Sequence, residues 1–506
     1  MNLLNLLQEI TSAHGDRLAF GRRSEGLGDR RLTYRQLSDQ AASLAGRLRA
    51  CRAERLVLCH EPAAVLPVAL FGAAWSGAAY LPVNYRLSDD ELRDRAQQAA
   101  PALAVTSEPD AQRLAGLDGL EIVTAGALHE DPAGGAEPAD CGDWPTDPDA
   151  TAVLLHTSGT TGPPKTAVLR HRHLTSYVLG MVEAASAGAD EAHVMAVPPY
   201  HVASVAAQLS QVHAGRRIVP LARFDADAWI DLVKTESATH AMLVPTMLIR
   251  IVDALQRRGE ALRSIRSVSY GAGRSHAGVV RRALESLPEA GFMHAYGLTE
   301  ASSTVCVLGP EDHRRFAASD DPVDQARLAS AGRPLPGVEV SVRDPDGSPT
   351  AAGSTGEIWV RGDQVSGEYA GSGVQLDADG WFRTRDLGRF DSDGYLWVQG
   401  RNDDVIVRGG ENLSPGEIEE VLLTHPGVSD AAVFGVPSRE WGEEPMACVV
   451  PRSPSQAPDA DELKQLVRRR LRSSRAPARL EFVDELPYND TGKLLRRELR
   501  QRFATP

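Results

Sequence analysis

The chain has 506 residues, which is enough for two or more domains with cores of their own. Its net charge of −14 argues against nucleic acids and anionic membranes as partners, so a bound nucleotide needs a local cluster of positive groups. Five scattered cysteines without a ligand or disulfide pattern favour the cytoplasm. We expect no signal peptide in residues 1–20, and no apolar run approaches membrane-spanning length.

Helical and strand patterns alternate in the first part of the chain. Spaced leucines predict a short amphipathic helix within residues 1–20, and helical spacing returns in residues 37–48. The elements predicted next are strands at 56–59 and 79–83 and helices at 63–76 and 89–99. This alternation predicts a largely parallel sheet with helices on its faces. Residues 108–148 are rich in Ala, Gly, Pro and Asp, so we expect mostly loop there.

The most informative stretch is the sequence LLHTSGTTGPPK at residues 154–165. A short apolar strand, 152–155, ends in hydroxyls and glycines, and Lys165 follows two prolines. Backbone amides exposed by glycine, four Ser/Thr hydroxyls and one lysine suit the phosphates of a nucleotide. The common P-loop needs Gly-Lys-Ser/Thr in succession, so this phosphate loop is of another kind. A surface loop rich in small polar residues is the alternative.

The alternation resumes beyond the phosphate loop. Strands are predicted at 193–197, 217–220, 241–244, 267–270 and 291–294. Three motifs come just after strand ends, namely Tyr200-His201, Gly271-Ala272-Gly273 and YGLTE at 296–300. Ligands of open parallel sheets bind at the carboxyl ends of strands, so these motifs should converge with the phosphate loop in one crevice.

The pattern of predicted elements changes beyond Gly332. Short alternating strands separated by Asp-Gly and Pro-Gly turns, at 338–342, 356–360 and 395–398, predict a small β-rich subdomain. The last hundred or so residues read as an α+β domain. Its first helix should begin with a capping box from Ser414 to Glu417, with proline at the first helical position. The predicted fold is therefore α/β, with domains at 1–402 and 403–506.

Several motifs in one order carry a resemblance to a known superfamily. They are the phosphate loop, YGLTE at 296–300, GWFRTRDL at 380–387, Gly400-Arg401, GGEN at 409–412 and NDTGK at 489–493. In this order they resemble the acyl-adenylate-forming superfamily, which comprises acyl- and aryl-CoA synthetases, nonribosomal-peptide adenylation domains and luciferases. The resemblance covers nearly all of residues 32–499. It implies that a carboxylate attacks the α-phosphate of Mg-ATP to give acyl-AMP and pyrophosphate, and that a thiol, usually that of CoA, then displaces AMP.

The resemblance also implies which residues bind ATP. The β- and γ-phosphates would be cradled by Thr157, Ser158, Gly159, Thr160, Thr161, Gly162 and Lys165. Glu300 is similar to the magnesium ligand of the family, and a carboxylate oxygen with phosphates and waters suits this hard cation. The nucleoside would meet Gly271, Ala272, His294, Tyr296, Gly297, Thr299, Asp386 and Arg401. Among these, Tyr296 should lie against the adenine, and Asp386 should accept bonds from the ribose hydroxyls.

The catalytic residues implied by the resemblance are Lys493, Thr161 and Glu300. The ammonium of Lys493 would bridge the attacking carboxylate and the α-phosphate, where negative charge crowds together. Asp403 matches the hinge about which the mobile C-terminal domain rotates between the two steps. After that rotation, CoA would meet Gly409, Gly410 and Arg475. The arginine-rich run at 468–479 either meets the phosphates of CoA or is a solvated helix face.

The acid pocket implied by the resemblance is lined by His201, Val202, Tyr270, Gly273, Leu298 and Ser303. Amino-acid adenylation domains have an aspartate at the position of Val202, which has no polar atom to offer. Since a buried ammonium without a partner costs several kcal/mol, at the lower end of about 2–7, an α-amino acid is disfavoured. His201 followed by valine is similar to aryl-CoA ligases, so we expect an aromatic or compact hydrophobic acid.

The sequence also departs from the family pattern. Thr166 stands where the family commonly has glycine, His294 where an asparagine often bonds the adenine, and Arg274 and His276 in a run that usually contains proline. The acceptor stays open between CoA and a separate carrier protein or another nucleophile, and the protein is expected to be a monomer or a homodimer. A non-enzymatic nucleotide-binding regulator is disfavoured, because Lys165 and Lys493 are both present.

Overall fold

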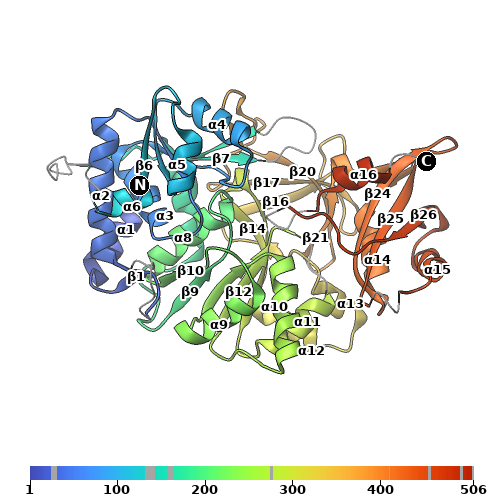
Figure 1. The fold of residues 1–506 in the computed structure, drawn as a ribbon. Helices are drawn as coiled ribbons and strands as arrows, with labels where there is room; N and C mark the ends of the chain where they lie inside the picture. Colours follow the sequence, from blue (N-terminus) through green and yellow to red (C-terminus); the bar gives the residue numbers. More distant parts are fainter. Residues whose placement is uncertain are drawn as a thin grey trace.

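Two large sheets separated by helices, together with a four-stranded antiparallel sheet, form the first 400 residues, and a smaller α+β unit follows them (Figure 1). The computed structural model describes residues 1–506 except for 24–30, 131–142, 158–164, 274–276, 410, 454–456, 490–493 and 504–506.

The first large sheet has eight strands in the order β19-β18-β8-β7-β4-β3-β5-β6. The strands are β3 (Arg55–Cys59), β4 (Ala79–Pro82), β5 (Ala102–Thr106), β6 (Leu120–Thr124), β7 (Thr151–Thr157), β8 (Lys165–Arg170), β18 (Glu368–Tyr369) and β19 (Gly373–Val374). Pairs from β7 to β6 are parallel, whereas β8, β18 and β19 join the edge antiparallel. The chain therefore reverses between β7 and β8, across the predicted phosphate loop.

The second large sheet has nine strands in the order β15-β14-β13-β12-β11-β9-β10-β1-β2. The strands are β1 (Leu18–Phe20), β2 (Leu32–Thr33), β9 (Ala192–Met195), β10 (Arg217–Pro220), β11 (His240–Leu243), β12 (Ser267–Gly271), β13 (Gly291–Leu298), β14 (Ser303–Leu308) and β15 (Arg333–Pro334). Its central strands, from β1 to β13, pair in parallel. The strand–helix alternation of the sequence thus gave the correct fold class, because each parallel pair needs a crossover connection.

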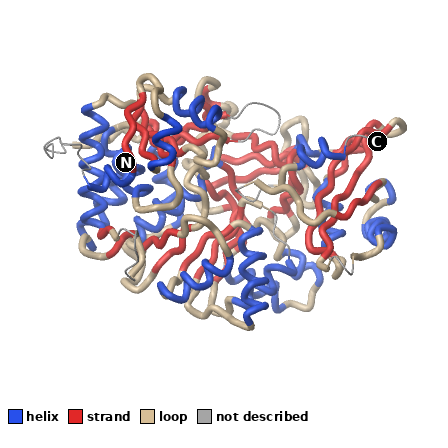
Figure 2. Tube along the Cα trace, viewed as in Figure 1, coloured by secondary structure: helices blue, strands red, loops and turns tan. Residues whose placement is uncertain are grey.

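Helices fill the space between the sheets and cover their outer faces (Figure 2). One apolar core between the sheets contains residues of α1 (Leu4–His14), α2 (Tyr34–Ala50), α3 (Val65–Ser76), α6 (Ala125–Glu130), α7 (His171–Met181) and α8 (Val202–Ala214). The outer helices are α4 (Asp89–Gln98) and α5 (Glu108–Leu114) on the first sheet, with α9 (Ala226–Glu236), α10 (Pro245–Arg258), α11 (Ala277–Ser286) and α12 (Pro310–Ala318) on the second. A short α13 (Pro322–Arg327) follows α12. Among the described residues, no helix combines the length and apolar character needed to cross a bilayer.

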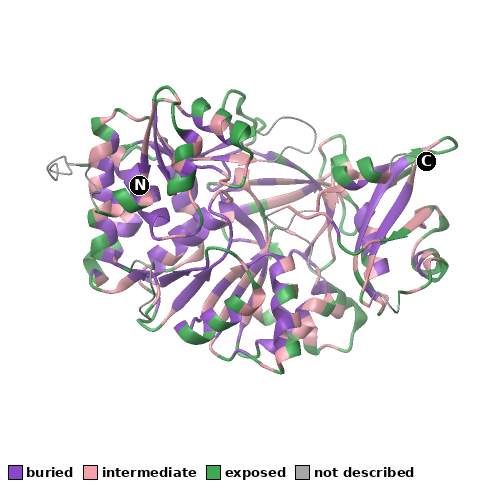
Figure 3. Cartoon of the chain, viewed as in Figure 1, coloured by how far each residue is buried: buried purple, intermediate pink, exposed green. Residues whose placement is uncertain are grey.

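The burial pattern follows these layers (Figure 3). Every residue of α3 except the last, Ser76, is buried, because this helix packs against α2, α1 and the first sheet. Its sequence is accordingly apolar on all sides rather than on one stripe.

The expectation of loop at 108–148 was wrong for its first part, which forms α5, β6 and α6. Ser107 caps α5 by accepting the amide of Asp110, and a proline lies in the first turn. Strand β6 then extends the sheet by parallel pairing with β5. Short elements of this kind are stabilised by the sheet edge they join, which composition alone does not reveal.

A four-stranded antiparallel sheet follows the two large ones. Its strands, in the order β16-β17-β20-β21, are β16 (Val338–Arg343), β17 (Gly356–Gly362), β20 (Phe382–Phe390) and β21 (Leu396–Arg401). The predicted β-rich subdomain is confirmed, and β20 adds a strand that the sequence pattern did not predict. As a result, most of the GWFRTRDL motif is strand rather than turn.

The last part of the chain forms a separate five-stranded sheet with three helices, at the right of Figure 1. Its elements are β22 (Ile406–Arg408), β23 (Glu411–Leu413), α14 (Pro415–Leu423), β24 (Val428–Ser438), β25 (Gly442–Pro451), α15 (Ala460–Arg470), η4 (Ser473–Arg475), β26 (Arg479–Phe482) and α16 (Arg496–Phe503). Two apolar clusters of its own pack on either side of this sheet. The one-turn helix η2 (Asn402–Asp404) connects it to β21.

The predicted capping box at α14 is wrong, although the helix begins with Pro415 as expected. The hydroxyl of Ser414 donates to the carbonyl oxygen of Gln399 at 3.0 Å instead of capping the helix. The carboxylate of Glu417 pairs with Arg475 and accepts a hydrogen bond from the side-chain amide of Gln399 at 3.3 Å. Both side chains are therefore used in tertiary contacts, one of which reaches back to β21.

A half-buried carboxyl group lies in the C-terminal sheet. Asp430 on β24 accepts the hydroxyl of Tyr488 at 2.8 Å and the amide of Ala431 at 2.8 Å. Burial raises the pKa of Asp430 from 3.8 to about 6, although these two hydrogen bonds oppose the rise. The folded protein thus holds a proton there that the unfolded chain loses at lower pH.

We predict that Asp430→Asn stabilises the C-terminal sheet at pH 7 and removes part of its pH dependence. As the pH rises from about 4 to 6, Asp430 loses its proton in the unfolded chain but keeps it in the folded protein. The free energy of unfolding of the wild type should therefore fall by up to about 3 kcal/mol over this range. Protection factors of residues 428–451, measured by hydrogen exchange with mass spectrometry across this window, check the prediction. The exposed Asp461→Asn variant is the control, and a profile of Asp430→Asn parallel to the wild type would contradict the prediction.

Candidate active site

The YGLTE motif lies on a strand rather than beyond one, which corrects the expected placement of residues 296–298. Strand β13 pairs in parallel with β12 as far as Ala295 and continues antiparallel to β14 up to Leu298. At Gly297 the two strands approach closely, because an added Cβ would lie 1.7 Å from the carbonyl oxygen of Ser303. Glycine is therefore required at this position by the packing of the protein itself.

A strained turn follows the motif. The one-turn helix η1 (Thr299–Ala301) is followed by Ser302 and Ser303, whose φ angles are 58° and 128°. The side-chain amide of Gln364 donates to the carbonyl oxygens of Ala301 and Thr304 at 3.0 and 2.7 Å. The hydroxyl of Ser302 in turn donates to the carbonyl of Gln364 at 2.9 Å. Positive φ angles in serine persist only where neighbours hold them, and such strain clusters at functional sites.

Glu300 is held by its main chain and by its carboxylate. The amides of Ser366 and Gly367 donate to its carbonyl oxygen at 2.8 and 3.1 Å. The hydroxyl of Tyr369 donates to its Oε1 at 2.5 Å. Burial and the carboxylate of Glu300 raise the pKa of Tyr369, so the hydroxyl keeps its proton at neutral pH.

Lys165 lies over the ring of the same tyrosine. Its Nζ is 4.9 Å from the ring centroid of Tyr369, within the range of a cation–π contact. The ring is brought there because β18 pairs with β8, with Tyr369 opposite Ala167. The predicted phosphate lysine and the predicted metal carboxylate are thus joined through one aromatic side chain.

Three of the predicted nucleoside-binding residues, Asp386, Tyr296 and Arg401, form a connected group. Asp386 is buried on β20, where Oδ2 accepts the hydroxyl of Tyr296 at 2.7 Å and Oδ1 lies 2.8 Å from Nε of Arg401. Burial lowers the pKa of Arg401, but the charges of Asp386 and Glu300 outweigh it and raise the pKa above its usual value. Burial and the charge of Asp386 likewise raise the pKa of Tyr296. At neutral pH, Arg401 is therefore a cation between two carboxylates.

His294 is buried on β13 and stacks on Tyr270, with ring centroids 4.9 Å apart. Its Nδ1 lies 2.7 Å from the carbonyl oxygen of Ser330. Burial lowers the pKa of His294, although hydrogen bonding to backbone carbonyls opposes this. The ring is therefore neutral and donates from Nδ1. The hydroxyl of Tyr270 is 2.8 Å from Nε2 of His313, so this residue of the predicted acid pocket presents no free polar group.

The end of β12 lies directly against β13. A Cβ added to Gly271 would be 2.3 Å from the carbonyl oxygen of Ala295, and Ala272 has a φ angle of 67°. The chain thus turns away from the sheet at Ala272. Gly273 follows in this turn, whereas Arg274 and His276 lie outside the described residues.

The predicted acid-pocket residues His201 and Val202 lie at the start of α8. His201 caps this helix, because its Nδ1 accepts the amide of Ala203 at 3.2 Å. Burial lowers the pKa of His201 to about 4, so the ring is neutral at pH 7. With Nδ1 used as an acceptor, the single proton lies on Nε2. Val202 is buried with 5% of its surface exposed.

The two ends of the phosphate loop are fixed by the β7–β8 hairpin. Thr157 is paired with Lys165, and its hydroxyl donates to the carbonyl oxygen of Lys165 at 3.2 Å. The predicted cradle residues between them, Ser158, Gly159, Thr160, Thr161 and Gly162, lie outside the described residues. Thr166, a departure from the family pattern, has its hydroxyl 3.0 Å from Nδ1 of His156.

Residues 490–493, which include the predicted adenylation residue Lys493, lie outside the described residues, but the chain is anchored on both sides of them. Tyr488 and Leu494 form an isolated antiparallel bridge. The next cation, Arg496, contacts Glu419 at 2.6 Å, Asp404 at 3.4 Å and the carbonyl oxygen of Val433 at 3.1 Å. Asp404 directly follows the predicted hinge residue Asp403 within η2.

The predicted CoA residues are placed only in part. Gly409 has a φ angle of 56° and donates its amide to the carbonyl oxygen of Trp441 at 2.8 Å, whereas Gly410 is outside the described residues. Arg475 is half-buried and paired with Glu417. The remaining arginines at 468–470 and 472 are exposed.

The donor set around Glu300 fits a magnesium ion that is held mainly by a substrate. Within the described part of the chain, no three His, Cys, Asp or Glu side chains gather into a metal site. One carboxylate beside a phosphate loop is the arrangement that Mg²⁺ adopts with nucleotides, whereas an all-protein cage would need more carboxylates. In the described residues, Oε2 of Glu300 accepts no hydrogen bond.

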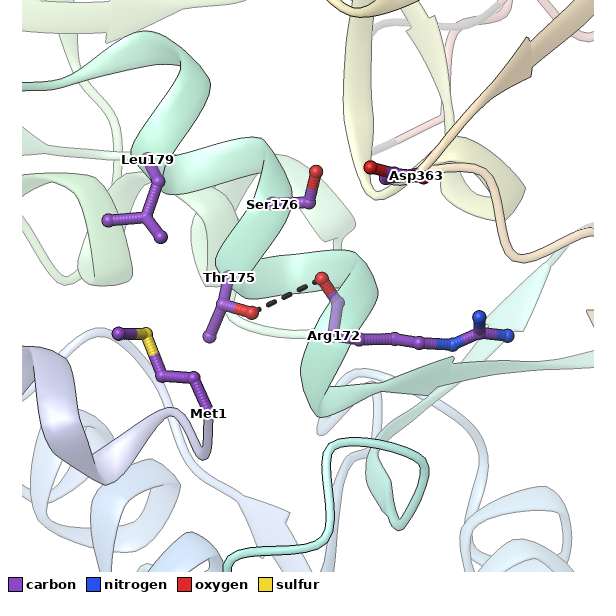
Figure 4. Close-up of a pocket in the computed structure, with 6 residues that line it drawn as sticks. All are labelled: Met1, Arg172, Thr175, Ser176, Leu179 and Asp363. Atoms are coloured by element: carbon purple, nitrogen blue, oxygen red, sulfur yellow. Dashed lines mark hydrogen bonds between the residues drawn. The ribbon is translucent and has the colours of Figure 1, made fainter.

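A surface cavity of about 370 Å³ lies beside α7 (Figure 4). It is lined by Met1, Arg172, Thr175, Ser176, Leu179 and Asp363. The only bond drawn between these residues is internal to the helix, from the hydroxyl of Thr175 to the carbonyl of Arg172. The cavity contains none of the predicted site residues, so it gives no reason to move the candidate site.

Sequence reasoning missed the residues that support the site. Gln364 and Ser366 lie between β17 and β18 and Tyr369 lies on β18, outside every motif that the sequence suggested. Arg496 follows the NDTGK motif, yet its ion pairs also depend on the fold. The position of Tyr369 depends on strand pairing between segments 198 residues apart, as the Arg170–Glu368 contact shows, and no local pattern encodes that.

Three similar proteins bear on the chemistry of this site. A feruloyl-CoA synthase from Amycolatopsis sp is 33% identical over 486 residues, covering 94% of this chain and 95% of that protein. A fatty acid–acyl-carrier-protein ligase from Streptomyces coeruleorubidus is 32% identical over 492 residues, covering 94% and 92%. The solved structure of o-succinylbenzoate CoA synthetase from Bacillus subtilis with ATP and magnesium superposes with a TM-score of 0.82 at 25% identity, covering 98% of this chain and 99% of that one.

Family models match most of the chain. The AMP-binding enzyme model matches residues 7–370, and the model of the AMP-binding enzyme C-terminal domain matches residues 417–493. The resemblance found in the sequence motifs is thereby confirmed at the level of the family. This chain belongs to the AMP-binding enzyme family.

Proposed function

We propose that this protein is an acid–thiol ligase that uses ATP to convert a carboxylic acid to acyl-AMP and then transfers the acyl group to CoA. In the first step the acid oxygen bonds to the α-phosphorus and pyrophosphate leaves; in the second the CoA sulfur bonds to the acyl carbon and AMP leaves. The observation that carries the proposal is the arrangement of Lys165 and Glu300 on one tyrosine, beside the Arg401–Asp386 pair. That arrangement matches a polyphosphate followed by a ribose.

The residues of the large domain would bind and orient ATP. Lys165 and the phosphate loop hold the β- and γ-phosphates, and Glu300 would hold Mg²⁺, which neutralises phosphate charge when bound. Asp386 accepts the ribose hydroxyls, and its ion pair with Arg401 keeps the carboxylate oriented. Little covalent help is needed, because phosphoryl transfer depends on positioning and charge.

Lys493 would supply the positive charge at the reacting atoms. Its ammonium lies between the attacking carboxylate and the α-phosphate in the adenylation arrangement and offsets the charge that accumulates there. For the second step the C-terminal domain turns about Asp403 and withdraws the lysine. That turn must break the contacts of Gln399 with Ser414 and Glu417, which link β21 to α14.

The acid is proposed to be aromatic or compact and hydrophobic. His201 can offer one neutral N–H donor from Nε2, and Val202 offers no group that could pair with an ammonium. The similarity to a feruloyl-CoA synthase agrees with an aryl acid. An α-amino acid is disfavoured, because its buried ammonium would have no partner here.

The acceptor has a second candidate, the pantetheine thiol of a separate carrier protein. The similarity to a fatty acid–acyl-carrier-protein ligase favours this alternative. The exposed arginines at 468–470 and 472 would suit either the phosphates of CoA or an acidic carrier surface. A direct comparison of acceptors separates the two.

We predict pyrophosphate release with aryl acids and weak or absent release with α-amino acids, because the proposed pocket lacks an anionic side chain. Purified protein is assayed against aryl, short-chain, long-chain and amino acids, each alone, with CoA and with a pantetheinylated carrier protein. Formation of the CoA thioester supports the leading proposal, and exclusive loading of the carrier protein supports the alternative. If none of the acids in the panel causes release of pyrophosphate, both proposals are contradicted.

Lys493→Ala should lower the acid-dependent exchange of pyrophosphate into ATP by about 100-fold or more, since a positioned charge at the reacting centre is lost. ATP binding, measured by calorimetry, should change little, because other residues are proposed to hold the nucleotide. Lys464→Ala, on α15 of the same domain, is the control and should keep its exchange rate. An unchanged exchange rate in Lys493→Ala would refute the role of the lysine.

Asp403→Pro should impair thioester formation more than adenylation. Proline fixes φ near −65° and restricts the preceding Asn402, so the proposed hinge is stiffened. The two half-reactions are measured separately, as exchange of pyrophosphate and as thioester formation from preformed acyl-AMP. Asp403→Ala removes the same carboxylate without stiffening the chain and serves as the control. Equal losses in both half-reactions would contradict the hinge.

A further inference from the structure

Tyr369 touches both groups that are proposed to meet the polyphosphate. Its hydroxyl donates to Oε1 of Glu300 at 2.5 Å, and its ring lies 4.9 Å from Nζ of Lys165. Neither contact belongs to a sequence motif. One side chain thus sets the spacing between a carboxylate in the one-turn helix η1 and an ammonium on strand β8.

The ring is held in place from several directions. Its own strand β18 pairs with β8 and β19. The neighbouring Glu368 makes two bonds to Arg170, at 2.8 and 2.9 Å, with both side chains largely shielded from solvent. Ser366 donates its hydroxyl to the carbonyl of Val168 and its amide to the carbonyl of Glu300. The segment before Tyr369 therefore ties β8 to the backbone of Glu300, so the ring cannot shift without disturbing both.

We propose that Tyr369 is a positioning residue for the nucleotide–metal complex, acting on Glu300 through its hydroxyl and on Lys165 through its ring. This inference rests on the proposed function, in which Glu300 holds the cation. A carboxylate whose Oε1 accepts the tyrosine hydroxyl presents Oε2 in one fixed orientation. Groups that orient a metal ligand in this way commonly change metal affinity by about 10–100-fold when they are removed.

The ring acts on Lys165 by a different interaction. A lysine side chain loses considerable rotamer freedom when it is ordered, and the face of the aromatic ring holds its ammonium before the phosphates arrive. The hydroxyl and the ring therefore have separable effects. Tyr369→Phe removes only the hydroxyl, whereas Tyr369→Leu removes both.

The experiment measures binding rather than turnover. Calorimetry with the full-length protein gives the affinity for ATP in EDTA and the Mg²⁺ concentration at which the affinity for ATP is half-enhanced. We expect Tyr369→Phe to raise that Mg²⁺ concentration by about ten-fold and to leave the affinity in EDTA unchanged. Tyr369→Leu should show the same metal shift and, in addition, about a two- to five-fold weaker affinity in EDTA.

Two further variants separate this inference from the proposed function. Glu300→Gln removes the carboxylate and should abolish the Mg²⁺ enhancement. Tyr395→Phe deletes a matched tyrosine–carboxylate bond, 2.9 Å from Asp312 and outside the site, and should behave as the wild type. Thermal unfolding of each variant shows whether the fold is kept.

The outcomes are distinct. If Glu300→Gln loses the Mg²⁺ enhancement but Tyr369→Phe keeps the wild-type profile, the positioning role is overturned and the proposed function stands. If Tyr369→Phe weakens ATP binding equally in EDTA and in Mg²⁺, the tyrosine is merely structural and the inference is likewise overturned. If Glu300→Gln itself keeps the enhancement, the proposed metal ligand is wrong and the inference falls with it.

Discussion

The pairing of β18 with β8 is the contact on which the candidate site depends. It joins segments 198 residues apart in sequence, and the later one, β18, lies in the chain between strands β17 and β20 of the small β-rich sheet. Through this pairing the lysine at the start of β8 lies over the ring of Tyr369, and the carboxylate in η1 accepts the hydroxyl of the same residue. Without it the two large sheets would each keep a core, but the charged groups at their edges would have no fixed spacing.

Local electrostatics explain how a few cations would be enough for an acidic protein to bind a polyphosphate. The chain carries a net charge of −14, so the overall field repels a polyphosphate. Arg401 keeps its charge between Asp386 and Glu300, and the ring of Tyr369 holds Lys165. The placement of these two cations thus compensates for the negative net charge of the protein. Because their surroundings are partly shielded from solvent, each contact is stronger than it would be in water.

Local patterns predicted the layers of this fold well and its long-range contacts poorly. The alternation of strands and helices predicted a largely parallel sheet with helices on its faces, because crossover connections impose that arrangement, and the structure has two sheets whose central strands are parallel. The strand β20 that carries Asp386 was not predicted, and Ser414 was assigned to a helix cap but donates to the carbonyl oxygen of Gln399. The supporting role of Tyr369 could not be predicted, since it follows from which strands become neighbours rather than from its own sequence context.

Arg496 has a mechanical consequence for the C-terminal domain. It bonds to Asp404, to Glu419 on α14 and to the carbonyl of Val433 on β24. For the proposed pivot at Asp403, Arg496 ties the residue that follows the pivot to α14 and β24, so the pivot and the C-terminal sheet would turn as one lever. A modest change in backbone torsion at η2 would then move the far end of that sheet through a much longer arc, with no rearrangement inside the domain.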